Sequence, residues 1–338
     1  MVATGVAVVG AVWRAKRRPA PFEGQSVLIT GGSRGLGLIL ARLFAREGAR
    51  VAILGRDRLS LLDAEQELRA LGADVDAFVC DVTDRADAEA AIDRIIARWG
   101  RIDVLVNNAG IILTGPFEHM QVEDFERQMA THFWAPLHLM RAALPHMRRQ
   151  GGARIVNIAS IGGKVAVPHL AAYCASKSAL VGLSDTLRAE LAKDRIAVTT
   201  VCPGLMRTGS HINAQFKGHH RAEYAWFAAG ASPLTSVDAE DSGRAIVEAT
   251  RRRRRMLIIS PQAKLMTWLN ALAPELFGAL ESVASRLLPG VAGPAGNEQK
   301  SGRESQTKWL PSMVTRQADE ASRRHNQRSP SVPESSVH

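Results

Sequence analysis

Short apolar runs alternate with longer helical segments from about residue 25 to residue 259, and this alternation limits the fold more than any other feature. The runs predicted to be buried strands are residues 27–29, 51–54, 75–79, 104–106, 155–158, 198–201 and 256–259. Segments with a 3.6-residue period lie between most of them, such as 36–47, 59–71 and 86–99. We therefore predict an α/β fold with a doubly wound, Rossmann-type parallel sheet and helices on both faces. Such sheets bind ligands at the carboxyl ends of their strands.

The N-terminal segment precedes this domain, which we take as residues 24–260. Residues 1–13 carry no charge, and a basic cluster at residues 14–18 follows directly. As a helix, residues 1–13 would be about 20 Å long, too short for a hydrocarbon layer of about 30 Å. A secretory signal carries its positive charges before the apolar stretch, whereas here they follow it. Segment 1–20 is therefore either a frayed helix or an anchor on the cytoplasmic face of a membrane, and we expect a cytoplasmic location.

An amphipathic helical extension is predicted after the domain, at residues 261–289. Its apolar residues recur at spacings of three and four, and Pro274 is placed to begin a second helix. These residues are Leu265, Leu269, Leu272, Leu276, Leu280, Val283 and Leu287. The apolar face either packs on the main domain or a sister subunit, or binds a membrane surface. Residues 290–338 are rich in Gly, Ser, Pro, Gln and Arg, which predicts a flexible tail.

The net charge of +10 belongs to the edges of the chain rather than to the central domain. The cluster at 14–18 contributes +4, the arginine run 251–255 contributes +5 and the region from Asn297 onward adds +2. The run 251–255 has no interleaved aromatic residues, so it indicates a solvated helix end or a patch facing anionic lipid, and we predict no nucleic-acid partner. The three cysteines lie far apart, which argues against a disulfide framework and a cysteine-rich zinc site.

A glycine-rich turn follows the first predicted strand and opens the next helix. Glycines allow a tight turn and a close approach of a pyrophosphate, while the helix N-terminus supplies free N–H groups and a positive dipole end. The pattern is typical of a dinucleotide site, although a turn that merely needs flexibility would look similar. Its predicted cofactor-binding residues are Gly31, Ser33, Arg34, Gly35, Leu36 and Gly37.

The end of the second predicted strand bears on the choice of cofactor. A carboxylate there would hydrogen-bond the ribose 2′-hydroxyl of NAD, but Gly55 and Arg56 occupy that place. Arg34 and Arg56 could both grip a 2′-phosphate through charge-assisted hydrogen bonds. We therefore expect NADP(H) to be favoured over NAD(H).

A serine, a tyrosine and a lysine form the candidate catalytic group. Tyr173 and Lys177 are four residues apart on a predicted helix and share one face. A nearby ammonium is expected to lower the tyrosine pKa toward neutrality, as proton transfer to a substrate oxygen requires. Ser160 follows the strand at 155–158 and lies at the sheet edge where a ligand would sit.

With these motifs, the chain from about residue 24 to residue 259 resembles the short-chain dehydrogenase/reductase family in its shorter, non-extended form. The resemblance rests on several motifs in the family's order. They are Thr30-Gly31-x-x-x-Gly35-x-Gly37, Asp81 after the third strand, Asn107-Asn108-Ala109-Gly110 after the fourth, Ser160, Tyr173-x-x-x-Lys177, and Pro203-Gly204 after the sixth.

The resemblance implies a role for each matching residue. Tyr173 would be the general acid/base, Ser160 would hydrogen-bond the substrate oxygen, and Lys177 would bind the nicotinamide ribose and depress the tyrosine pKa. Tyr173 and Lys177 thus also belong to the cofactor site. Its other implied members are Asp81 and Val82 at the adenine, Asn107, Ala109 and Gly110 along the cleft, and Pro203, Gly204 and Thr208 near the carboxamide.

One position departs from the family's pattern. Where the family commonly has an asparagine that completes a proton relay to the lysine, this chain has His132. Histidine donates, accepts and titrates near neutrality, so a relay could persist with a different pH profile. His132 could equally be only a packed helix residue.

The resulting hypothesis is an NADP(H)-dependent oxidoreductase that interconverts a carbonyl and a secondary alcohol; the alternative is a non-catalytic NADP(H)-binding sensor or scaffold. The segment 205–233 would cover the substrate, and its aromatic residues suggest a bulky, apolar carbonyl compound. These residues include His211, Phe216, His219, His220, Tyr224, Trp226 and Phe227. The segment has one carboxylate, Glu223, and no cysteine, so we expect no metal. The family resemblance also implies a homodimer or homotetramer through the helices around 123–149 and 170–193.

Overall fold

The structure is a computed structural model of the chain, and it describes residues 22–230, 236–306 and 320–327. The N-terminal segment 1–20, with its predicted frayed helix or anchor, lies outside these residues. No helix of the part described is both long and apolar enough to cross a membrane.

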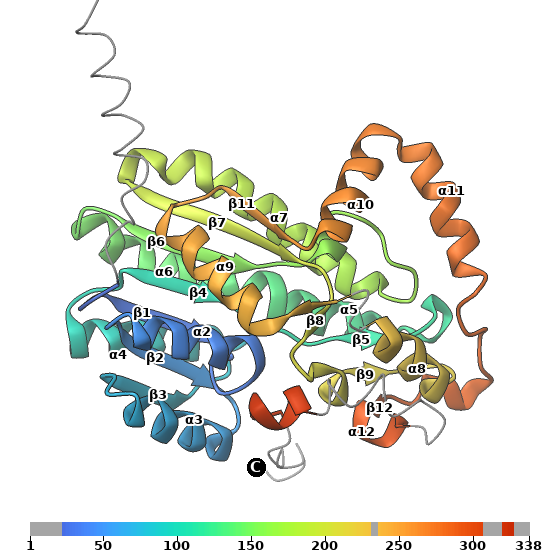
Figure 1. Cartoon of the computed structure of the whole chain (residues 1–338), viewed down its shortest axis with the longest axis horizontal. Coiled ribbons are helices and arrows are strands. Elements are labelled where there is room, and N and C mark those ends of the chain that lie inside the picture. Colours follow the sequence, from blue (N-terminus) through green and yellow to red (C-terminus); the bar gives the residue numbers. More distant parts are fainter. Residues whose placement is uncertain (1–21, 231–235, 307–319, 328–338) are drawn as a thin grey trace, which may run out of the picture.

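A parallel sheet of seven strands forms the centre of the molecule (Figure 1), as predicted. Its strands, in chain order, are β1 (Ser26–Thr30), β2 (Arg50–Gly55), β3 (Val75–Val79), β4 (Val104–Asn107), β6 (Ala153–Ile158), β7 (Ile196–Pro203) and β11 (Met256–Ile259). Their spatial order is β11-β7-β6-β4-β1-β2-β3, and every neighbouring pair is parallel. The order reverses between β1 and β4, so their carboxyl ends flank the crevice where such sheets bind ligands.

Helices cover both faces of the sheet because successive strand residues point to opposite sides. One core packs Val27 and Ile29 against α2 (Gly35–Arg46), α3 (Arg58–Ala70) and α9 (Ala239–Arg251). The other packs Leu28 against α4 (Arg85–Trp99), α6 (Ala135–Arg149) and α7 (Ala171–Leu191). Aspartates begin three of these helices: Asp57, Asp84 and Asp238 each accept two backbone N–H groups from the first turn.

A π-helical turn joins α5 (Val122–Met129) to α6. It spans Ala130–Trp134, and it turns His132 into the interior while Trp134 remains 48% exposed. His132 is thereby placed against α7, the helix of Tyr173 and Lys177.

Smaller elements cover the carboxyl edge of the sheet. They are β5 (Leu113–Thr114), β8 (Met206–Arg207), β9 (Gln215–Phe216), α8 (His220–Gly230) and β10 (Val237–Asp238). β9 pairs with β5, which connects the segment after β7 to the loop after β4. A buried ion pair of 2.5 Å between Lys217 and Asp124 ties the same segment to α5.

The helical extension forms as predicted, with α10 (Pro261–Leu272) and α11 (Pro274–Ser285) projecting from one end of the sheet (Figure 1). Asn270 donates a hydrogen bond to the Lys164 carbonyl, and Phe277 is buried. The predicted apolar face does not pack on the main domain: Leu272 is 81% exposed and Leu287 85%. Within residues 22–230, 236–306 and 320–327, no element covers this face.

The region after residue 289 differs from the predicted flexible tail in the parts that the structure describes. β12 (Lys300–Ser301) pairs with β9, and α12 (Gly302–Ser305) begins with a capping box formed by Ser301 and Glu304. Residues 320–327 also lie against the main domain. Polar and glycine-rich composition predicted flexibility because it offers little apolar surface, but hydrogen bonds dock these residues instead.

The arginine run 251–255 pairs with carboxylates of its own chain. Arg251 bridges Glu47 and Glu248, Arg252 also pairs with Glu248, and Arg255 lies 3.4 Å from Asp185. These pairs offset part of the positive charge that the sequence concentrates here.

Candidate functional site

The glycine-rich turn leads from β1 into α2 and is held tightly. A Cβ on Gly37 would lie 2.1 Å from the Gly31 carbonyl oxygen, and Gly31 and Gly35 have φ angles of +63° and +57°. Arg34 precedes α2 without capping it by its side chain, and Leu36 is buried in the core. The turn therefore presents backbone rather than side chains at the helix N-terminus, as phosphate binding requires.

Two residues outside the predicted site fix this turn. Thr30 Oγ1 accepts the N–H groups of Asn108 and Ala109, both at 2.9 Å. Asn108 Nδ2 donates to the carbonyls of Thr30, at 2.9 Å, and Gly31, at 3.3 Å. Both residues stand within the motifs quoted above, but the motifs alone did not show that they bond to one another.

Asn107 occupies a different place from the one expected along the cleft. Its side chain is 3% exposed and donates to Asn157 Oδ1 at 2.7 Å. Asn157 donates in turn to Ser184 Oγ at 2.8 Å. The Asn107 side chain thus links β4, β6 and α7 inside the core, while Ala109 and Gly110 lie beyond the strand end and are more accessible.

Positive charge gathers near the end of β2. Burial lowers the pKa of Arg34, the carboxylate of Asp57 opposes that shift, and the guanidiniums of Arg56 and Arg303 reinforce it. Arg34 therefore lies within electrostatic reach of both other arginines. Arg303 comes from α12, and no motif pointed to it.

Asp81 and Val82 follow β3 at the same edge of the sheet. The Asp81 carboxylate accepts from the N–H and hydroxyl of Thr83, at 2.9 and 2.7 Å. Pro203 is the last residue of β7, and Gly204 and Thr208 follow it. Thr208 Oγ1 accepts from the Ser210 amide at 3.3 Å. The predicted cofactor residues thus meet at one edge, with the side chain of Asn107 as the exception.

Ser160, Tyr173 and Lys177 come together after β6. Ser160 starts a short turn after the strand, and its Oγ accepts from the Gly162 amide at 3.1 Å. The Ser160 side chain lies close enough to the Tyr173 hydroxyl to favour its ionised form, which acts to lower the Tyr173 pKa. Lys177 Nζ donates to the Ile158 carbonyl at 2.9 Å and lies 5.7 Å from the centre of the Tyr173 ring.

The expected fall of the Tyr173 pKa toward neutrality is wrong for this structure. Burial raises the pKa of Tyr173 to about 12, although the Ser160 side chain acts in the opposite direction. Burial also lowers the pKa of Lys177 to about 7. Both shifts have one cause. Removal from water disfavours the charged phenolate, and it equally disfavours the charged ammonium that was expected to stabilise the phenolate.

His132 lies beside this group but makes bonds of its own. Its Nε2 accepts from the Ile111 amide at 3.1 Å, so the neutral ring carries its proton on Nδ1, which is 2.8 Å from Ser176 Oγ. Burial, with the charge of Lys177 nearby, lowers the pKa of His132 well below its usual range. The imidazole therefore stays neutral near pH 7, and it meets the Tyr173 ring edge-on at 5.4 Å between centres.

The aromatic residues of the predicted lid form their own small core. Phe216, Tyr224 and Phe227 are buried against one another, with Trp226 partly buried at the margin. Glu223 is fully buried and accepts from Trp226 Nε1 at 2.6 Å and from His169 Nδ1 at 2.9 Å. The rings therefore stabilise the lid itself, and residues 231–233 of the segment lie outside the described part.

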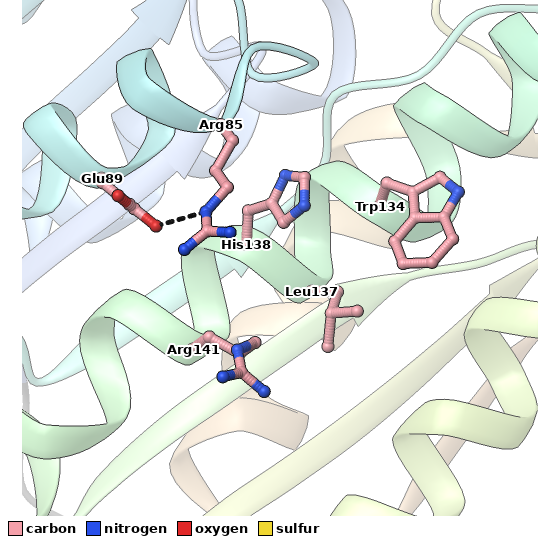
Figure 2. Close-up of a pocket in the computed structure, with 6 residues that line it drawn as sticks. All are labelled: Arg85, Glu89, Trp134, Leu137, His138 and Arg141. Carbon is pink, nitrogen blue, oxygen red and sulfur yellow. Dashed lines mark hydrogen bonds and ion pairs between the residues drawn. The ribbon is translucent and has the colours of Figure 1, made fainter.

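Within the described residues, no group of three or more His, Cys, Asp or Glu side chains could hold a metal ion. A cavity of about 240 Å³ lies away from the site, between α4 and α6 (Figure 2). Arg85 and Glu89 line it from α4, and Trp134, Leu137, His138 and Arg141 line it from the α6 side. It contains none of the predicted site residues.

Comparisons with known proteins agree with this geometry. The profile of the family described as short chain dehydrogenase matches residues 25–217. A dehydrogenase/reductase SDR family protein 7-like of Anopheles gambiae is 33% identical over 270 residues, covering 78% of this chain and 83% of the relative. An 11-beta-hydroxysteroid dehydrogenase-like 4A of Arabidopsis thaliana is 32% identical over 256 residues, covering 75% and 82%.

A solved structure of the same family has a similar fold. It is a short-chain dehydrogenase/reductase from Burkholderia phymatum in complex with NAD, with a TM-score of 0.70 and 26% identity. The match covers 76% of this chain and 96% of that one. The protein belongs to the short-chain dehydrogenase/reductase family of oxidoreductases.

Proposed function

We propose that the protein is an NADP(H)-dependent oxidoreductase that interconverts a carbonyl compound and a secondary alcohol. The observation that carries this proposal is the group of Ser160, Tyr173 and Lys177 at the carboxyl edge of the sheet. It adjoins the crevice between β1 and β4, where a parallel sheet of this order binds a dinucleotide.

The residues present fit a nicotinamide dinucleotide. The close packing of Gly37 on Gly31 brings backbone rather than side chains to the N-terminus of α2, which suits a pyrophosphate. The residues proposed to hold the remainder are Asp81, Val82, Ala109, Gly110, Lys177, Pro203, Gly204 and Thr208. When bound, the nicotinamide supplies or accepts a hydride.

The preference for NADP(H) is supported by the arginines near the end of β2. Arg34 and Arg56 lie within electrostatic reach of each other, and Arg303 adds a third guanidinium. A 2′-phosphate would relieve their mutual repulsion and accept charge-assisted hydrogen bonds. Asp57 is held as the N-cap of α3 and is not free to serve the ribose as the usual carboxylate does.

The three catalytic residues divide the acid–base work. In the reductive direction, Tyr173 donates its phenolic proton to the substrate oxygen, and Ser160 hydrogen-bonds the same oxygen. A pKa of about 12 keeps Tyr173 protonated and ready to donate at neutral pH. Lys177 would bind the ribose hydroxyls and, when charged, stabilise the phenolate that remains. His132 is proposed as a positioning residue, because its bond to Ser176 supports the helix turn that carries Tyr173.

A bulky, apolar carbonyl compound remains the proposed substrate class. The name of the Arabidopsis relative, which is hydroxysteroid dehydrogenase-like, supports it. The lid rings support it less than their number suggested, since Phe216, Tyr224 and Phe227 contact one another.

A screen with purified protein tests the proposal. NADPH oxidation is followed with a panel of lipid, steroid and polycyclic ketones, and alcohol oxidation with NADP⁺, each repeated with NADH or NAD⁺. We expect turnover with at least one bulky ketone and a preference for NADPH. Tight NADPH binding without turnover on any substrate would instead favour a sensor or scaffold.

Two surfaces support a proposed oligomer and a proposed membrane attachment. The first is the cavity between α4 and α6, beside Trp134, where we propose the contact of a homodimer or homotetramer (Figure 2). We propose that the apolar face of α10 and α11 meets a membrane on its cytoplasmic side. Light scattering of the purified chain and flotation with anionic vesicles test the two separately.

A further inference from the structure

Residues 320–327 lie in the glycine-rich turn, at the place proposed for the dinucleotide phosphates. The amide of Gly35, the first residue of α2, donates to the His325 carbonyl at 2.8 Å. Asn326 Nδ2 donates to the Ser33 carbonyl at 3.1 Å. A Cβ on Gly35 would lie 2.5 Å from Gln327 Nε2, so this side chain fills the space directly above the turn. The Gly35 N–H, which could donate to a phosphate oxygen, thus donates to the His325 carbonyl of the same chain.

The other end of the segment reaches the opposite side of the site. A Cβ built on Gly209 would lie 2.5 Å from Ser322 Cα, which shows that the segment packs directly on the residue after Thr208. Ser322 is fully buried there. The segment therefore runs from the loop expected to hold the carboxamide to the turn expected to hold the pyrophosphate. A bound dinucleotide would need the same space.

Side chains of the main domain hold the segment in place. Arg42 donates to the Arg324 carbonyl at 3.0 Å, and its other terminal nitrogen lies 3.3 Å from His325 Nδ1. Asn213 and Arg303 each donate to the Gln327 carbonyl at 3.1 Å. Figure 1 shows the segment in red beside the start of α2.

The composition of the segment makes it displaceable. It reads Glu-Ala-Ser-Arg-Arg-His-Asn-Gln and has no large apolar side chain. Hydrogen bonds rather than hydrophobic burial hold it, and a charged ligand can offer the same donors stronger acceptors.

We propose that residues 320–327 are an autoinhibitory segment that occupies the dinucleotide site and must leave before the cofactor binds. This inference rests on the proposed function of the glycine-rich turn. The apparent cofactor affinity of the whole chain is then reduced by the fraction of molecules in which the segment is docked.

The first test compares the NADPH and NADH dissociation constants of three full-length chains by calorimetry. Ser322→Trp places a large ring against the backbone at Gly209 and prevents docking, without touching the proposed catalytic or cofactor residues. Ser282→Trp makes the same change at an exposed position of α11 and serves as the matched control. We expect Ser322→Trp to lower the Kd for NADPH roughly tenfold, with wild type and Ser282→Trp alike.

The second test uses the wild-type chain and needs no substitution. Hydrogen exchange is measured across residues 320–327 with and without saturating NADPH. The amides of His325 and Gln327, which are bonded to Ala321 and Ser322, are expected to lose protection when the cofactor binds. Retained protection at saturation, or equal Kd values in all three chains, would overturn the inference and leave the proposed function standing. Failure of both cofactors to bind any of the chains would overturn the proposed function and this inference with it.

Discussion

His132 Nδ1 and Ser176 Oγ lie 2.8 Å apart, and this bond joins the π-helical turn to α7, the helix of Tyr173 and Lys177. Ser176 Oγ donates onward to the Tyr173 carbonyl at 2.9 Å. The imidazole therefore acts on the proposed acid through the backbone of α7, with Ser176 between them.

Replacing His132 by alanine is expected to lower kcat without changing the shape of its pH profile. The ring is held neutral by burial, so its loss removes a support and not a titrating group. Two buried hydrogen bonds are lost as well, which costs about 1–3 kcal/mol of unfolding free energy. Profiles of kcat from pH 5.5 to 9 and urea unfolding check both effects. A limb near pH 6.5 that is present in wild type and absent from the variant would show that His132 titrates during turnover.

Tyr173→Phe removes the proposed acid while keeping the ring against His132. Turnover is expected to fall by about 10² to 10⁴, the usual contribution of a positioned acid or base. The Kd for NADPH should stay within about twofold of wild type, because the remaining cofactor contacts are unaffected. Steady-state kinetics and calorimetry measure the two quantities, and full activity in the variant would remove Tyr173 from its role.

Lys177 makes stability depend on pH in an unusual direction. Its pKa is about 7 in the folded chain against an ordinary value of 10.5, so between these values the unfolded chain binds more protons. Unfolding free energy should therefore rise with pH in this window, by up to about 1.4 kcal/mol per pH unit from this one group.

Lys177→Met isolates that contribution, since every other group is shared. The unfolding free energy of wild type minus that of Lys177→Met is expected to increase from pH 7 to pH 9.5. Parallel urea titrations of the two chains measure it. Parallel curves for the two chains would mean that Lys177 keeps its ordinary pKa in the fold.

Arg56→Asp is expected to reverse the cofactor preference. A carboxylate there would repel a 2′-phosphate and could accept the ribose 2′-hydroxyl instead. Loss of a hydrogen bond to a charged group costs about 1.5–3 kcal/mol, so the NADPH to NADH ratio of kcat/KM should fall at least tenfold. Arg58→Asp, an equal charge change at the exposed first residue of α3, is the control. The same ratio in wild type and Arg56→Asp would contradict the arginine assignment.

The central sheet could be predicted because each of its strands is a short apolar run. Runs such as 27–29 and 51–54 are apolar enough to require burial on both faces, and the structure buries both. The glycine-rich turn and the Ser160, Tyr173 and Lys177 group could be located from strand ends and helix faces, while their roles came from the family resemblance.

What escaped prediction depends on contacts between distant parts of the chain. Asn107 and Asn108 are adjacent in sequence, and only the strand's pleat decides that the first points into the core and the second toward the turn. The sequence showed that the lid is rich in aromatic residues. It did not show that their rings pack against one another. Arg303 and residues 320–327 reach the site from a polar region without periodicity, where no pattern marks a docking position.

The amide pair inside the sheet has a consequence for folding. Asn107 and Asn157 stand opposite each other in the register of β4 and β6. If one strand slid by a single residue, both amides would face apolar side chains without partners, at a cost of about 1–3 kcal/mol each. A wholly apolar pair would tolerate such a slip far better. The two asparagines therefore favour a single alignment of these strands. They thereby also fix the relative position of the loops that follow β4 and β6, which carry Gly110 and Ser160.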